Sequence, residues 1–104
     1  MKEINKVIIN KISDGNKLTL SLEGRLTTAT AVDLEKSLNE SLDGVTELVF
    51  DFSDLKYISS AGMRVLLSAQ KRMSSQGSMM VTGVSNDIME IFEITGFTDI
   101  LTIE

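Results

Sequence analysis

The sequence predicts an α/β fold with a mixed sheet, an N-terminal antiparallel hairpin, parallel βαβ units and helices mainly covering one face. Strand-like and helix-like segments follow one another in the order β-β-α-β-α-β-α-β. Strand–helix–strand units favour parallel neighbouring strands joined by right-handed crossovers. The few helices that a chain of 104 residues can supply are not enough to cover both faces of such a sheet.

The first two strands are predicted to form the hairpin. Residues 4–12 are rich in β-branched side chains, and residues 13–16 are a cluster of turn formers. Residues 18–23 alternate strictly between apolar and polar side chains, which is typical of a strand with one buried face. Gly24 is expected to end this second strand.

The first helix is predicted over residues 31–42, where apolar side chains recur at steps of three and four residues. Thr30 with Asp33 resembles a capping box at its start, and Gly44 closes its end. Residues 48–52 are nearly continuously apolar, which favours a central strand covered on both faces. The acidic residues that follow are expected to form a turn.

A second apolar helical stripe spans residues 63–73, and residues 74–77 end it. Residues 79–82 are predicted to form a short strand. Ser85 or Asn86 is a suitable cap for a third helix that ends at Gly96. Residues 100–103 are expected to form a final short strand or an edge segment.

Composition excludes several classes of function. The chain has no Cys and no His, so thiolate or imidazole metal sites, cysteine nucleophiles and a Ser-His-Asp triad are all excluded. A net charge of −5 has the wrong sign for binding a phosphate backbone, so no direct nucleic-acid partner is expected. No apolar run approaches the ~20 residues of a membrane span. We therefore expect a single cytoplasmic domain over residues 1–104, without catalytic residues, cofactor or metal.

The most informative residues are Ser59 and Ser60, which lie between the central strand and the second helix. A serine at a helix start typically caps a backbone N–H group, a contact worth ~1 kcal/mol. The same position suits phosphorylation, because the helix dipole offsets part of the added negative charge. Both roles are compatible with Ser60, and Ser59 is the alternative phosphoacceptor. Ala61 and Gly62 keep the turn narrow, either for helix packing or for close approach of a partner.

Two other interpretations involve neighbouring residues. Asp51 and Asp54 form a carboxylate pair suited to magnesium, although Asx and Ser turns that include Ser53 explain the same residues. A Ser-Lys dyad of a small serine hydrolase would use Lys56 with Ser59 or Ser60, and it would require a buried lysine.

The segment 51–67, in which a strand, acidic residues, a serine pair, a glycine and an apolar helix occur together, resembles the signature of STAS domains. It is most similar to that of bacterial anti-sigma factor antagonists. Residues 24–31 resemble the second recurring segment of that family. The order of elements also matches, so the resemblance covers essentially the whole chain and implies a single STAS domain with a STAS-like fold.

The resemblance implies partner switching. The unphosphorylated antagonist binds an anti-sigma factor that is also a serine kinase, and the sigma factor is released. The kinase phosphorylates a serine that corresponds to Ser60, the complex dissociates, and a phosphoserine phosphatase restores it. The implied contact surface comprises Thr27, Thr28, Ser59, Ser60, Ala61, Gly62, Met63 and Arg64.

Two positions depart from the family pattern. The family commonly has Asp where this chain has Ser59 and where it has Thr27, so two negative charges near Ser60 are absent. Kinase recognition is expected to differ accordingly. A STAS scaffold that is not phosphorylated, or a STAS module that binds a ligand, is the alternative function within the family.

Overall fold

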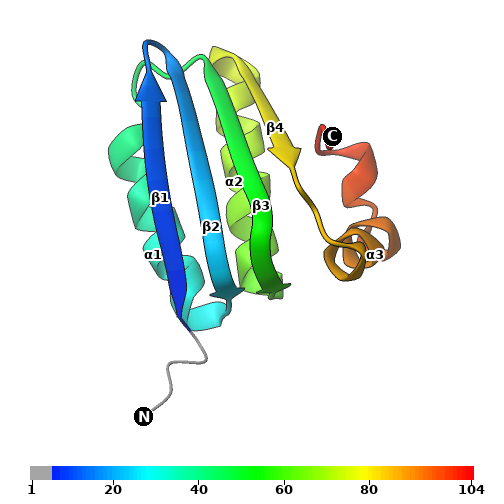
Figure 1. The fold of residues 1–104 in the computed structure, drawn as a ribbon. Coiled ribbons are helices and arrows are strands. Elements are labelled where there is room, and N and C mark those ends of the chain that lie inside the picture. The colour runs from blue at the N-terminus through cyan, green and yellow to red at the C-terminus, as the bar shows by residue number, and fades with distance from the viewer. Residues whose placement is uncertain (1–5) are drawn as a thin grey trace.

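Four strands form a mixed sheet in the order β1-β2-β3-β4, and the structure, a computed structural model, describes residues 6–104 (Figure 1). The strands are β1 (Val7–Asp14), β2 (Lys17–Leu26), β3 (Glu47–Ile58) and β4 (Ser78–Thr82). β1 pairs antiparallel with β2, whereas β2–β3 and β3–β4 are parallel. The predicted mixed sheet is therefore confirmed. The predicted start of the first strand, residues 4 and 5, lies outside the described residues.

The helices are α1 (Thr28–Ser41), α2 (Ser60–Gln76) and α3 (Asn86–Thr95), and a short 3-10 helix η1 (Phe97–Asp99) follows α3. α1 and α2 lie behind the sheet and α3 lies beside β4, so one face is mainly covered as predicted (Figure 1). Ser85 caps α3, and Gly96 ends it in the left-handed conformation. No final strand forms in the described chain. Instead, Ile103 makes a single parallel bridge to Val81, which corresponds to the predicted edge segment.

The core lies between the sheet and the two helices behind it. Alternate residues of β2 and successive residues of β3 are buried, as are the apolar stripes of α1 and α2. The fully buried side chains include Leu20, Leu22, Leu34, Phe50, Phe52, Leu66 and Met73. Burial of each such side chain stabilises the fold by about 1.5–3 kcal/mol relative to exposure. This layer holds the strand ends, and the helices that begin there, in fixed positions.

Gly24 does not end the second strand, contrary to the prediction. β2 continues to Leu26, and Gly24 remains paired with Val7 on one side and with Leu55 on the other. Its φ of +99° is unfavourable for other residues, and a Cβ atom there would run into the Lys6 carbonyl. Glycine therefore permits an irregularity in the strand, and β2 continues past it to Leu26.

The predicted acidic turn after residue 52 is also wrong, because β3 continues to Ile58. Its register against β2 shifts between the Ser21 and Glu23 pairs and again after Gly24, so β3 carries extra residues at these points. The Asp51 carboxylate accepts hydrogen bonds from Ser53, at 3.0 Å from the backbone N and 2.6 Å from Oγ. The Asx-type contact was thus correctly expected, but it supports a β-bulge.

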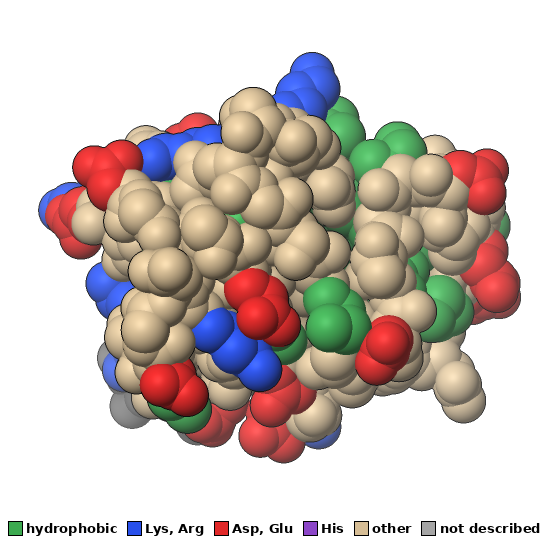
Figure 2. Space-filling view, turned by 90° about the horizontal axis from the view of Figure 1, so that it is seen from above, with side chains coloured by type: hydrophobic (Ala, Val, Ile, Leu, Met, Phe, Trp, Pro, Cys, Tyr) green, Lys and Arg blue, Asp and Glu red, His purple; other side chains and the backbone are tan. Residues whose placement is uncertain are grey.

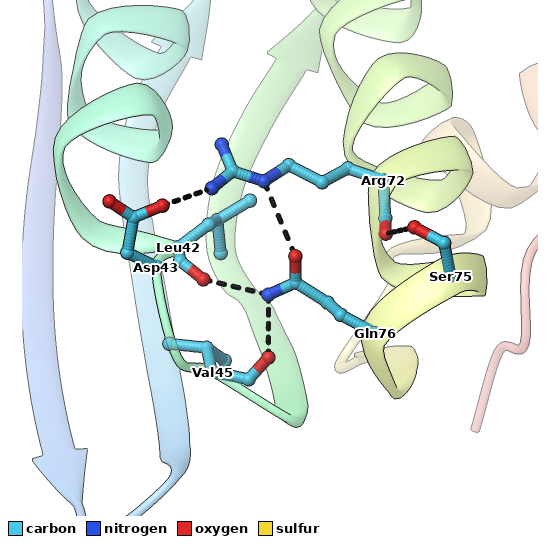
Figure 3. Close-up of polar contacts among 6 residues, drawn as sticks. All are labelled: Leu42, Asp43, Val45, Arg72, Ser75 and Gln76. Carbon is cyan, nitrogen blue, oxygen red and sulfur yellow. Dashed lines mark hydrogen bonds and ion pairs between the residues drawn. The ribbon is translucent and has the colours of Figure 1, made fainter.

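The C-terminal ends of α1 and α2 are joined at the opposite end of the molecule. Gln76 Nε2 donates to the carbonyl oxygens of Leu42 and Val45, both at 2.7 Å (Figure 3). Arg72 pairs with Asp43 across the same gap, at 2.8 Å (Figure 3). Figure 2 views the molecule from this end, where acidic and basic side chains are interspersed. These contacts satisfy carbonyls of the α1–β3 loop and fix the end of α2.

Candidate functional site

The N-termini of α1 and α2 lie side by side at the carboxyl edge of the sheet. Leu26 and Ile58, the last residues of β2 and β3, are paired in register. The Ser59 N–H donates to the Leu26 carbonyl at 2.8 Å, which extends this pairing by one residue. Each strand then passes into its helix through a single capping residue, Thr27 for α1 and Ser59 for α2.

Thr27 and Thr30 form a reciprocal capping box at the start of α1. Thr27 Oγ1 accepts from the Thr30 N–H at 3.2 Å, and Thr30 Oγ1 accepts from the Thr27 N–H at 2.7 Å. The Thr30 hydroxyl also donates to the Arg25 carbonyl at 2.8 Å. The predicted box of Thr30 with Asp33 is therefore wrong, because α1 begins three residues earlier than its apolar stripe.

Ser59, and not Ser60, is the N-cap of α2. Ser59 Oγ accepts from the Gly62 N–H at 3.1 Å, and the Ser59 residue is buried with 9% exposure. The capping role predicted for Ser60 is thus wrong. Ser60 is the first helical residue and is exposed, and within residues 6–104 its hydroxyl makes no hydrogen bond. The cap therefore uses one hydroxyl of the pair and leaves the other accessible.

The remaining residues of the predicted contact surface differ in exposure. Gly62 is buried, and a Cβ atom there would lie 2.8 Å from Leu26 Cδ2. Met63 is only 7% exposed and belongs to the core. Thr28 and Arg64 are exposed beside Ser60, whereas Thr27 and Ala61 are half-buried. The accessible part of the predicted surface is therefore centred on Thr28, Ser60 and Arg64.

The two helix N-termini present positive potential without a compensating acid. Neither α1 nor α2 has an acidic residue in its first turn, whereas α3 has Asp87. An added anion at such an exposed terminus is stabilised by about 0.3–1 kcal/mol. Arg64 lies four residues after Ser60 and so on the same helix face. A phosphate on Ser60 would meet favourable charge from its own helix.

Two grooves flank Arg64. The α1–α2 groove is lined by Thr28, Ala31, Val32, Glu35, Ala61, Arg64, Val65 and Ser68. The α2–α3 groove is lined by Ser60, Met63, Arg64, Leu67, Thr95 and Phe97. Sequence reasoning missed both grooves. The sequence offered two signals for them. One is Val32, an apolar residue that is 61% exposed in the structure, and the other is Phe97, which directly follows the helix-ending Gly96.

The other interpretations of this region find little support in the geometry. Lys56 is exposed, so the buried lysine that a Ser-Lys dyad requires is not at this position. Asp51 Oδ1 is already engaged by Ser53. Within residues 6–104, no three acidic side chains group together in a way that would hold a metal ion. None of the described helices is both long enough and apolar enough to span a bilayer.

The hydrogen bonds from Ser53 lower the pKa of Asp51 below its ordinary value of 3.8, with a smaller contribution from Ser21. Since the pKa is lower in the folded state, this carboxylate stabilises the fold above about pH 4, and the stabilisation is lost as pH falls through the folded-state pKa. We expect Asp51→Asn to reduce the difference in urea midpoint between pH 7 and pH 3. Ser53→Ala should reproduce part of that effect. An unchanged pH difference in Asp51→Asn would contradict the assignment.

Comparisons with known proteins agree with this architecture. The STAS domain family model matches residues 3–104. The chain is 37% identical to the "Putative anti-sigma factor antagonist BtrV" of Bordetella bronchiseptica, over 94% of this chain and 84% of that protein. An anti-sigma factor antagonist from Mycobacterium paratuberculosis matches with a TM-score of 0.88 at 16% identity, over 99% of this chain and 89% of the other.

SpoIIAA, an anti-sigma factor antagonist from Bacillus, has been solved in unphosphorylated and phosphorylated forms, and both share this fold. The TM-scores are 0.75 and 0.74, at 13% and 14% identity. Each match covers 93% of this chain, with 87% and 91% of the SpoIIAA chains.

Proposed function

The chain belongs to the STAS domain family, and we propose that within it this protein is a cytoplasmic anti-sigma factor antagonist that acts by partner switching. The unphosphorylated form binds an anti-sigma factor that is also a serine kinase, and the sigma factor is released. Phosphorylation of Ser60 ends that binding, and a phosphoserine phosphatase restores it. ATP binds the kinase, and this chain has no catalytic role of its own.

The observation that carries the proposal is the division of labour between the two serines. Ser59 is buried and its hydroxyl caps α2, whereas Ser60 is exposed at the first helical position. A kinase can therefore reach Ser60 without dismantling the cap. The 37% identity to BtrV, and the fold shared with SpoIIAA in both phosphorylation states, support the same role.

The proposed contact surface combines Thr28, Ser60 and Arg64 with the two grooves beside them. A phosphate at Ser60 adds about −1.5 to −2 charges to this surface. The helix N-terminus tolerates that charge, so the domain stays folded. An interface formed around a neutral hydroxyl does not tolerate it, because the charge would be desolvated there without a partner.

The test is incubation of the purified chain with ATP and a candidate anti-sigma factor kinase, followed by intact-mass and peptide mass spectrometry. We expect one phosphate on Ser60 of the wild type and none on Ser60→Ala. Ser59→Ala should still be phosphorylated at Ser60, although loss of its cap lowers the free energy of unfolding by ~1 kcal/mol. Phosphate on Ser59 would overturn the assignment to Ser60. Absence of phosphate from the wild type, with a kinase that is shown to be active, would also overturn it and would favour an unmodified STAS scaffold.

A further inference from the structure

The outer edge of β1 is the open edge of the described sheet. At the opposite side, the C-terminal segment covers β4: the Val81 N–H donates to the Thr102 carbonyl and the Glu104 N–H to the Val81 carbonyl, both at 2.9 Å. β1 is the outermost strand on its side, and its eight residues pair with β2 without a bulge (Figure 1). A long, regular edge of this kind is a template for another strand.

The β1–β2 register identifies which backbone groups of β1 face outward. The Arg25 N–H donates to the Lys6 carbonyl at 3.0 Å, so the backbone of Lys6 points toward β2. The direction of the backbone N–H and C=O groups alternates along an antiparallel strand. The backbone groups of even-numbered residues therefore bond to β2, and those of odd-numbered residues point outward. The outward residues are Val7, Ile9, Lys11 and Ser13.

Two apolar side chains lie exposed on β1, on the sheet face that α1 and α2 leave open. Ile8 is 47% exposed and Ile12 is 60% exposed. They are four residues apart, with Asn10 midway between them. An antiparallel strand centred on Asn10 would place an isoleucine opposite each of them.

We propose that β1 pairs with β1 of a second copy of this chain, antiparallel about a two-fold axis at Asn10, to form one sheet that is continuous through a homodimer. Val7 then pairs with Ser13 and Ile9 with Lys11, and each pair exchanges two backbone hydrogen bonds. All four of these residues have outward-facing backbone groups, as such pairing requires.

The side chains are self-complementary in this register. Ile8 lies opposite Ile12, and Lys6 lies opposite Asp14, in the non-hydrogen-bonded pairs whose side chains approach most closely. Because of the two-fold axis, each of these contacts occurs twice in the dimer. On the open face of the sheet, the register therefore joins apolar with apolar and positive with negative side chains, whereas on the other face Val7 lies opposite Ser13 and Ile9 opposite Lys11.

Neighbouring registers lose this match. Centring the pair on Ile9 places Ile12 opposite Lys6 and Ile8 opposite Asn10. Centring it on Lys11 places that lysine opposite its own copy, and like charges directly opposite are destabilising. Charge and apolar pairing thus select the register centred on Asn10.

The dimer would leave the proposed contact surface around Ser60 accessible. β1 lies at one side of the sheet, and α2 begins beyond β2, at the end of β3 (Figure 1). The proposal therefore does not depend on the role of Ser60, and either inference can fail without the other.

Cysteine scanning tests both the dimer and its register, because the chain has no cysteine of its own. In Asn10→Cys, the two Cα atoms would lie about 4.5 Å apart, within the range of a disulfide. In Lys11→Cys, they would lie beyond the ~7 Å that a disulfide spans. On non-reducing gels after equilibration with glutathione, we expect a covalent dimer of Asn10→Cys and a monomer of Lys11→Cys. Equal cross-linking of both variants would overturn the register.

A charge substitution at the axis tests the interface without cross-linking. Asn10→Lys places two like charges opposite each other, whereas Asn10→Thr places two threonines there, a favourable pair. By sedimentation equilibrium we expect Asn10→Lys to raise the dimer dissociation constant about fivefold or more and Asn10→Thr to leave it near wild type. Circular dichroism checks that both remain folded, since residue 10 is exposed. A wild type that stays monomeric at all concentrations, or equal dimerisation of both variants, would overturn the proposal.

Discussion

Replacing Ser60 by aspartate is expected to weaken binding to the anti-sigma factor by about 2 kcal/mol or more, a factor of roughly thirty in Kd. The new carboxylate would be desolvated in the interface without a partner. The isolated domain should not be destabilised, because the position is exposed and a negative charge at a helix N-terminus is favourable. Arg64 on the same helix face adds to that effect. Isothermal titration calorimetry measures the Kd, and urea unfolding measures the stability.

The matched control for this substitution is Ser60→Asn, which has nearly the same shape as aspartate but no charge. We expect it to bind within a few fold of the wild type, as should Ser60→Ala. If Ser60→Asp bound as tightly as Ser60→Asn, charge at this position would not control the complex. The electrostatic mechanism would then be wrong.

Gly77→Ala is expected to lower the free energy of unfolding by about 3 kcal/mol or more, at the upper end of overpacking effects. Gly77 ends α2, and its N–H donates to the Met73 carbonyl at 2.7 Å. A Cβ atom there would overlap the backbone of Thr46, whose carbonyl accepts the Ser78 N–H at 2.9 Å. Backbone atoms cannot move aside as a flexible side chain can, so the start of the β3–β4 ladder would be displaced.

Gly44→Ala separates this steric effect from the general cost of replacing glycine. Gly44 has a φ of +80°, and no atom lies within 4 Å of the position of its Cβ. Its substitution should cost only about 1 kcal/mol, from the unfavourable backbone conformation. Chemical denaturation gives the free energy of unfolding of both variants. Similar losses of stability in the two would contradict a steric clash with the Thr46 backbone.

The order of elements could be predicted because each segment has its own periodicity. The alternation of Leu18, Leu20 and Leu22 identified β2, and the three- and four-residue steps that include Leu34 and Leu38 identified α1. These patterns reflect which side chains face the core. The ends of the elements were less predictable, since polar residues at the ends are not constrained by burial.

The choice between Ser59 and Ser60 as the cap illustrates this limit. Both side chains are suitable caps, so local sequence does not distinguish them. The choice is made by the hydrogen bond from the Ser59 N–H to Leu26, which comes from a distant strand. Likewise, Asp51 and Ser53 have the composition of a turn, but pairing with β2 keeps them in a strand.

The two departures from the family pattern have a shared structural explanation. Thr27 and Ser59, which replace commonly acidic residues, are the N-caps of α1 and α2. Asp, Ser and Thr can all accept the capping hydrogen bond, so the helix starts are preserved. What changes is the charge beside Ser60, which in the proposed function would affect recognition by a kinase and not the fold.

Helix α2 is fastened at both of its ends. At its start, Ser59 bonds to Leu26 and Gly62 packs against the sheet edge, and at its end Gln76 and Arg72 hold the α1–β3 loop. These contacts at both ends oppose sliding or rotation of α2. In the proposed switch, a phosphate on Ser60 would therefore change only the charge of the surface around it, and the rest of the domain would keep its conformation.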